Sequence, residues 1–291
     1  ARITAITANG GNITMADLTT TTSGTGSISY SATGSVALSL LTSTSGNINV
    51  TADSGAANTG AITDITALET ANLVTTGIVT LSAAAGIGSA GVLADIDTTI
   101  GTLVATNDTT GNIFVQETNG LIIGGTGVRT TGGNGNINVD VDAGNLIINS
   151  VVTANGSGTV TLNADAGLVD INAVVSSTSG LILVTGDSIT QDANISTGST
   201  ATVTVTADNG DITMANGTTT SNGSGIVAYT ATGNIALSVI NSTSGNVNIT
   251  ADSGAANTGA ITDNTAAEAA NVITTGIATF SAAAGIGSAG G

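Results

Sequence analysis

The sequence repeats itself at a fixed offset of 199 residues. Segment 53–64 returns unchanged as segment 252–263, and the residues on either side of it match at the same offset without a gap. Long exact repeats of this kind are typical of solenoids and arrays, in which each unit stacks on the next one. We therefore predict one full unit over residues 1–199 and the first half of the next unit over residues 200–291, stacked continuously.

A shorter rhythm runs inside the unit. Glycine or Gly-Asn opens segments in which apolar and polar residues alternate, as in Gly46-Asn-Ile-Asn-Val50, and alternation is the pattern of a half-buried strand. Gly111, Gly135, Gly158 and Gly180 follow one another at intervals of 24, 23 and 22 residues. These intervals predict an all-β fold, a right-handed parallel β-helix (β-solenoid) with coils of about 22–26 residues. The residues predicted to point inward include Ile13, Val50, Val115, Val139 and Leu162.

The composition favours thin layers of small side chains over a globular core. The chain has 41 Gly, no Pro and no Trp, and only 2 Phe and 2 Tyr, although 41% of its residues are apolar. Tandem immunoglobulin-like sandwiches are the main alternative fold. Such domains commonly fill the space between their sheets with a large aromatic residue, and this sequence has no Trp to do so.

The charge pattern excludes several classes of function. The net charge is −17, with two Arg and no Lys, so the chain lacks the cations that a nucleic-acid partner requires. No run approaches the roughly 20 apolar residues of a membrane span. The absence of His, Cys and Lys leaves no pairing of a nucleophile with a base, and we expect no enzymatic activity.

Calcium is the candidate cofactor, because Asp, Asn and Gly in turns supply the carboxylate and carbonyl oxygens that this ion binds. One candidate cluster occurs in both copies of the repeat and another lies in a single strand and turn. The alternative is that these residues only form turns and keep the surface soluble. The candidate ligands are Asp53, Asn58, Asp64 and Glu69, their equivalents Asp252, Asn257, Asp263 and Glu268, and the pair Asp140 and Asp142.

Several segments resemble the repeats of a known group of proteins. Gly111-Asn-Ile-Phe-Val115 and segment 84–90 (Ala-Ala-Gly-Ile-Gly-Ser-Ala) are similar to repeats of filamentous-haemagglutinin-type proteins and other giant bacterial β-strand-repeat surface proteins. The pattern extends over essentially the whole chain. The resemblance implies a secreted β-helical shaft with structural or adhesive duty, and it implies no catalytic residue.

These observations lead to two functional expectations. The first is a structural extracellular rod at the cell surface, the shaft of a bacterial filament, sheath or giant adhesin, whose partners are other copies of the repeat unit, end to end. The alternative is an adhesive module that presents the irregular stretches 52–76 and 251–275 to glycans or proteins on host or bacterial surfaces. Neither expectation involves nucleic acid or a membrane span.

Overall fold

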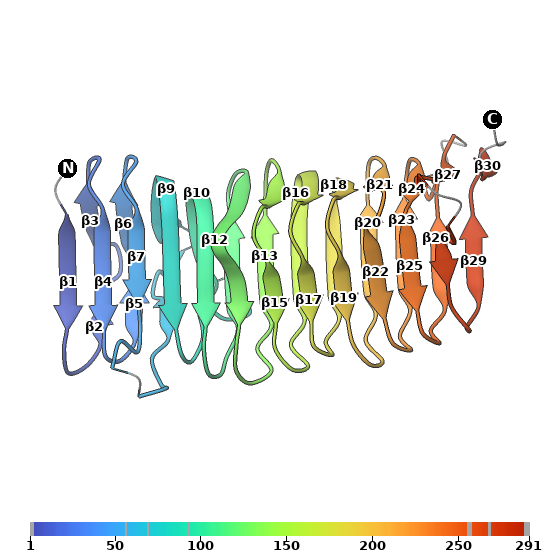
Figure 1. Ribbon diagram of the computed structural model, residues 1–291. Helices are drawn as coiled ribbons and strands as arrows, with labels where there is room; N and C mark the ends of the chain where they lie inside the picture. The colour runs from blue at the N-terminus through green and yellow to red at the C-terminus, as the bar shows by residue number, and fades with distance from the viewer. Residues whose placement is uncertain are drawn as a thin grey trace.

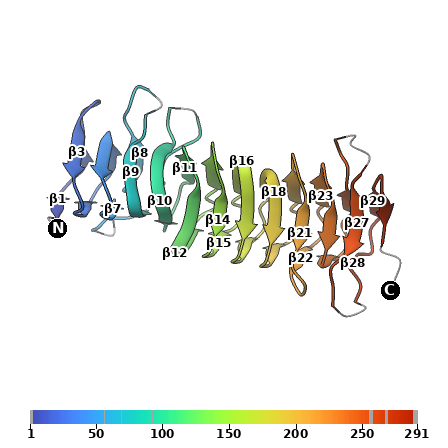
Figure 2. The same ribbon diagram turned by 90° about the horizontal axis from the view of Figure 1, so that it is seen from above.

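The computed structural model describes residues 3–55, 57–68, 70–91, 93–254, 258–266 and 269–287. Within these ranges the chain contains strands and no helix, and it winds into about 12 coils of about 23 residues. The strands pair in parallel with the strands of the coils before and after them. Figures 1 and 2 show the coils following one another along one axis, with the two ends of the chain at opposite ends of the rod. The predicted β-solenoid is confirmed.

Three ladders of strands make up the first part of the rod. The broad first ladder consists of β1 (Thr4–Ala8), β4 (Ile28–Ala32), β7 (Ile48–Thr51) and the second parts of β9 (Leu73–Ala83) and β10 (Ile96–Asn107). The second ladder consists of β2 (Ile13–Thr14), β5 (Val36–Leu38) and β8 (Ile62–Asp64). The third ladder consists of β3 (Thr20–Ser23), β6 (Leu40–Ser43) and the first parts of β9 and β10.

Three ladders also make up the last part of the rod. The broad ladder consists of β11 (Ile113–Glu117), β13 (Ile137–Val141), the first parts of β16 (Val160–Ile171) and β18 (Ile182–Gln191), and then β20 (Val203–Ala207), β23 (Val227–Ala231), β26 (Val247–Thr250) and β29 (Ala278–Ser281). One narrow ladder consists of the first part of β12 (Leu121–Thr130), β14 (Leu146–Ile148), the second parts of β16 and β18, and then β21 (Ile212–Met214), β24 (Ile235–Leu237), β27 (Ala260–Asp263) and β30 (Gly285–Ile286). The other narrow ladder consists of the second part of β12, β15 (Val152–Ala154), β17 (Val175–Ser177), β19 (Ile195–Thr197), β22 (Thr219–Asn222), β25 (Val239–Ser242) and β28 (Val272–Ile273).

The ladders change partners between β10 and β12. The second part of β10 pairs with both halves of β12, through Leu103 with Ile123 and Ala105 with Val128. The two halves of β12 then continue separately into β14 and β15. On the other side of the rod, β11 pairs with the first part of β10 and, at Ile113, continues the second ladder. The broad ladder therefore divides into two narrow ones, and two narrow ladders merge into a broad one.

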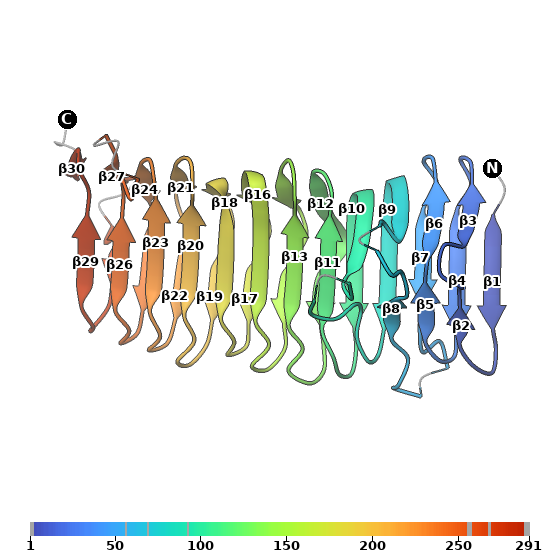
Figure 3. The ribbon, with the colours of Figure 1, turned by 180° about the vertical axis from the view of Figure 1, so that it is seen from behind.

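This exchange places the two copies of the repeat on opposite sides of the rod. β20 is the repeat equivalent of β1. The broad ladder of β1 and β4 faces the viewer in Figure 1, whereas the broad ladder of β20, β23, β26 and β29 faces the viewer in Figure 3, which is seen from behind. The reason is that 199 residues are not a whole number of coils of about 23 residues. The second copy is thus turned by about half a turn about the rod axis.

One continuous apolar core fills the interior from the first coils to the last. Val50, Val115, Val139 and Leu162 are buried as predicted, whereas Ile13 is half-buried because its coil is the first one. Asparagine side chains at the turns link neighbouring coils: the Oδ1 atom of Asn136 accepts a hydrogen bond from the backbone N of Thr159 at 2.9 Å. These contacts give turn residues a role in stacking, as side-chain ladders do in cross-β structures.

Candidate functional site

The first repeated candidate, Asp53, opens the turn between β7 and β8. Its φ of 65° lies in the left-handed region, and Asp252 repeats this conformation with a φ of 63°. Asp53 Oδ2 accepts a hydrogen bond from the backbone N of Asn58 at 2.8 Å, which closes the turn. Asn58 Oδ1 in turn accepts a hydrogen bond from the Thr109 hydroxyl at 3.2 Å. Asp53 and Asn58 therefore lie together, whereas Asn257 is outside the described residues.

The second repeated candidate, Asp64, ends β8 and fixes the following turn. Asp64 Oδ1 accepts hydrogen bonds from the backbone N of Thr66 at 2.7 Å and from Asn72 Nδ2 at 2.6 Å. Asp263 makes the equivalent bonds, with Thr265 N at 2.7 Å and Asn271 Nδ2 at 2.8 Å. The bond from Asn271 and those from Thr265 lower the pKa of the Asp263 carboxyl. Both aspartates thus serve as acceptors that hold the chain where it enters the next strand.

The calcium interpretation of these residues remains a prediction. Glu69 and Glu268 lie outside the described residues. Among the residues that are described, the acidic side chains form no group of three or more that could hold a metal ion. The hydrogen bonds of Asp53, Asp64 and Asp263 are those of turn-forming carboxylates, which is the alternative that the sequence left open.

Asp140 lies on the outer side of β13, and Asp142 directly follows this strand at an acidic corner of the rod. Asp140 Oδ1 accepts a hydrogen bond from Asn163 Nδ2 at 2.8 Å, and Asp142 Oδ1 accepts one from Gln116 Nε2 at 3.0 Å. Burial, followed by the charges of nearby aspartates, raises the pKa of Asp140. Strand register places four aspartates at this corner in successive coils, namely Asp142, Asp165, Asp187 and Asp208. Like charges stacked in this way favour counter-ions in the surrounding solvent.

Glu117 is a buried carboxyl group that the sequence analysis does not single out. It ends β11 with its side chain in the core, where Thr98 Oγ1 donates to its Oε2 atom at 2.6 Å. The backbone N of Ile100 donates to Oε2 at 3.1 Å, and that of Asn119 donates to Oε1 at 3.2 Å. Burial raises the pKa of Glu117 to about 7. The alternation of Ile113, Val115 and Glu117 along one strand is the signal that could have placed this side chain inside.

Glu117 lies where the ladders change partners, and this position explains its hydrogen bonds. β10 pairs with β11 as far as Thr98, and the pairing with β12 starts at Thr102. The backbone N of Ile100 falls in the gap between these two pairings. A buried backbone donor without an acceptor is costly, and an oxygen of the Glu117 carboxyl group supplies the acceptor. Glu117 thus stabilises the exchange that turns the second repeat copy.

The predicted adhesive stretches 52–76 and 251–275 are not uninterrupted loops. Each contains a short strand of the solenoid, β8 in the first copy and β27 in the second. Segments 88–91 and 93–95 separate Ile87 from β10, and within them the backbone N of Ser89 donates to Ala94 O at 2.7 Å. The turn after β7 lies at the lower edge of the rod in Figure 1, and its equivalent after β26 lies at the upper edge.

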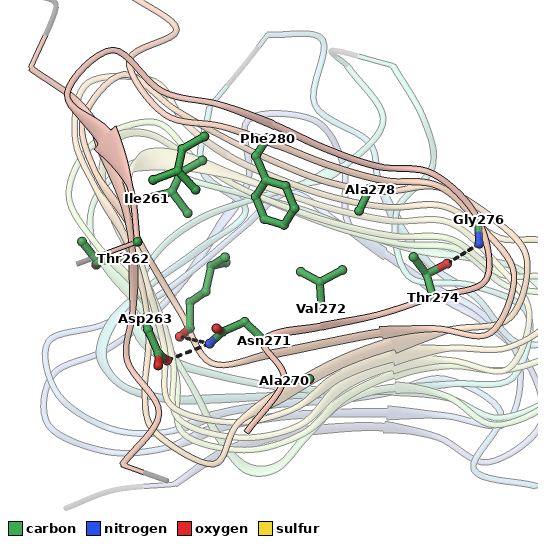
Figure 4. A pocket seen from close by; sticks show the side chains of 13 residues that line it. Ile261, Thr262, Asp263, Ala270, Asn271, Val272, Thr274, Gly276, Ala278 and Phe280 are labelled. Carbon is green, nitrogen blue, oxygen red and sulfur yellow. Dashed lines mark hydrogen bonds between the residues drawn. The ribbon is translucent and has the colours of Figure 1, made fainter. Parts of the chain in front are cut away.

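The last described coil leaves a hollow of about 480 Å³ at the end of the rod. Figure 4 shows Ile261, Val272 and Phe280 around this hollow, with Asn271 bonded to Asp263 at one side.

In the described residues, no helix is long and apolar enough to cross a membrane. No protein-family model, curated protein or solved structure matches the chain. The inferences on function therefore rest on the geometry of the solenoid and on its repeat.

Proposed function

We propose that the chain is part of a structural extracellular rod, the shaft of a surface filament, sheath or giant adhesin, and that its partners are further copies of the unit, end to end. The observation that carries the proposal is the continuity of the ladders at the boundary between the two copies. β18 pairs with β20, and β19 pairs with β22, so neither ladder is interrupted near residue 200. The core is equally continuous there. A rod whose units share one core resists bending better than beads on linkers.

The surface supports the same proposal. The outward positions of the strands are mostly Thr, Ser and Asn, and the acidic residues give the chain a charge of −17. A high charge of one sign keeps a protein soluble and separates rods from one another. Such a surface suits a shaft that works in contact with water at the outside of a cell.

Electron microscopy of the native material tests this proposal. With strands about 4.8 Å apart, a unit of about eight and a half coils should advance the rod by roughly 40 Å. Because each copy is turned by about half a turn, identical faces should recur at roughly 80 Å. The expected image is a thin, unbranched fibre with these two spacings. Globular beads without axial periodicity would refute the proposal.

An adhesive role is the second candidate, and one observation favours it. The equivalent turns after β7 and β26 face opposite edges of the rod, so a surface that binds glycans or proteins would be offered on both sides. Replacing segment 53–55 and segment 252–254 separately, each by the same glycine and serine linker, should then weaken binding to cell surfaces in steps. Equal binding by the parent chain and by a variant with both replacements would refute the adhesive role, and only the structural role would remain.

A further inference from the structure

The C-terminal end of the rod exposes side chains of the kind that the core buries elsewhere. Phe280 is 37% exposed and Ile286 is 55% exposed, and both border the hollow at the end of the rod. Apolar side chains gathered at the end of a solenoid mark a surface that another coil can cover.

The same surface occurs a second time in this chain, and there it is covered. The repeat equivalents of Val272, Phe280 and Ile286 are Leu73, Leu81 and Ile87. These three residues are at most 1% exposed, because β10 and β11 lie on them. The structure therefore contains one surface in two states, bare at the end of the rod and covered in its interior.

The covering segment in the first copy makes a defined set of contacts. Strand register pairs Leu73 with Thr98, Val79 with Leu103, and Leu81 with Ala105, and Ile87 is bridged to Ile113. Leu103 and Ile113 are completely buried by this arrangement. The first copy thus shows which side chain of the covering segment lies over each residue of the surface.

A polar contact fixes the register of the covering segment. The backbone N of Asn72 donates to Asp97 O at 2.8 Å, and the backbone N of Asp97 donates to Asn72 Oδ1 at 3.0 Å. The amide group of Asn72 is held by its bond to Asp64. At the open end, Asn271 is held by Asp263 in the same way, and Figure 4 shows this pair at the edge of the hollow. The acceptor that aligns the covering segment is therefore already in place.

We propose that the C-terminal end of the rod is a strand-addition site for a polypeptide segment with the sequence of residues 96–113, bound in parallel and in the register of the first copy. The inference rests on the proposed function, because it names the partner of the end of the rod. In this complex, the residue of the bound segment that corresponds to Leu103 lies in the hollow between Ala278 and Val272. The residue that corresponds to Asp97 pairs with Asn271. Backbone hydrogen bonds give the contact its strength, and the inward side chains give it its specificity.

An extended chain tests the proposal. Residue 291 corresponds to residue 92 in the repeat, so residues 93–130 are appended directly after residue 291 of the full chain. Hydrogen exchange is measured at the amides of Asn271 and of 278–281, with and without the extension. We expect exchange at these amides to slow by at least about tenfold, because the new coil protects them from opening. Amides of the first coils, such as that of Thr7, should not change and serve as internal controls.

A matched control has the same extension with Leu103→Asp and Ile113→Asp in the appended copy only. This control should leave exchange at Asn271 as fast as in the parent chain. Equal exchange in parent and extended chains, or equal protection by the control, would overturn the proposal. Protection of the parent chain that grows with its own concentration would also overturn it, because the occupant would then be the end of a second copy. Electron microscopy of the native material separates the two proposals. Slower amide exchange in the extended chain without fibres in the native material would refute the rod. Fibres without slower amide exchange in the extended chain would refute the strand-addition site.

Discussion

A column of stacked glycines at one corner of the solenoid should set the spacing between coils. A Cβ atom at Gly158 would lie 2.0 Å from the backbone O of Gly135, and one at Gly180 would lie 2.0 Å from the backbone O of Gly158. No side chain fits at such distances, and the obstacle is backbone, which cannot rotate away. Ser177 completes the corner, since its hydroxyl donates to Gly158 O at 2.7 Å and accepts from Gly180 N at 2.8 Å. Gly158→Ala is therefore expected to force two coils apart.

The size of the effect follows from these contacts. Overpacking a dense interior typically costs about 1–3 kcal/mol. The hydrogen bond from Ser177 to Gly158 would also be weakened, and a buried hydrogen bond contributes about 1 kcal/mol. We expect Gly158→Ala to lower the free energy of unfolding by about 2–4 kcal/mol. Because each coil contacts only its neighbours, the loss should be concentrated in the coils next to residue 158.

Urea denaturation, together with hydrogen exchange resolved by segment, measures this loss. Gly24→Ala is the matched control, because a Cβ atom at Gly24 would meet nothing within 4 Å and its φ lies outside the left-handed region. The control should be neutral or slightly stabilising, since alanine restricts the unfolded chain. If Gly158→Ala and Gly24→Ala shift the urea midpoint equally, the reasoning from corner sterics is wrong.

Three further predictions concern pH, calcium and a buried tyrosine. Because the folded chain holds a proton on Glu117 up to about pH 7 whereas a free glutamate loses it near 4.5, stability should fall by up to about 3 kcal/mol as pH rises through this window. Glu117→Gln should flatten that part of a pH–stability curve, and an unchanged slope would contradict the assignment. If segment 53–69 binds calcium, chelation should lower the melting temperature and added calcium should restore it, whereas superimposed melting curves would favour the turn-forming role. Tyr229→Phe should lower stability by about 1 kcal/mol more than Tyr30→Phe, because the Tyr229 hydroxyl also donates to Gln191 Oε1 at 2.6 Å; equal losses would show that this bond contributes nothing.

Local patterns in the sequence predict the local structure well. The alternation around Val50, Val139 and Leu162 gives the inward side chains, because in a strand the burial of one residue sets that of its neighbours. Glycine spacing gives the length of the coil, because glycines stack where coils approach closely. The interruption between Ile87 and Ile96 is not found in this way, since the sequence there continues the small and glycine-rich pattern of the strands beside it.

Contacts between coils are harder to predict from the sequence. The bond between Asp64 and Asn72 joins two ends of a turn whose path is unknown until the ladders are known. The contact of Glu117 with Ile100 depends on where two pairings of β10 leave a gap, and no spacing in the sequence marks that gap. Identical segments can also have different surroundings, as the exposed Ile286 and the buried Ile87 show.

The half turn between copies gives the repeat length a consequence for the whole rod. If a unit were a whole number of coils, every copy of a turn such as that after β7 would lie along one edge, and the acidic corner would form a single stripe. With about eight and a half coils, each copy presents the same strands on the opposite side. The exchange of ladders at β10–β12, with Glu117 supplying the acceptor for Ile100, is the local device that makes this turn compatible with a continuous core. A rod built in this way has two equivalent sides, so neighbours or ligands that recognise one side are offered the same surface on the other.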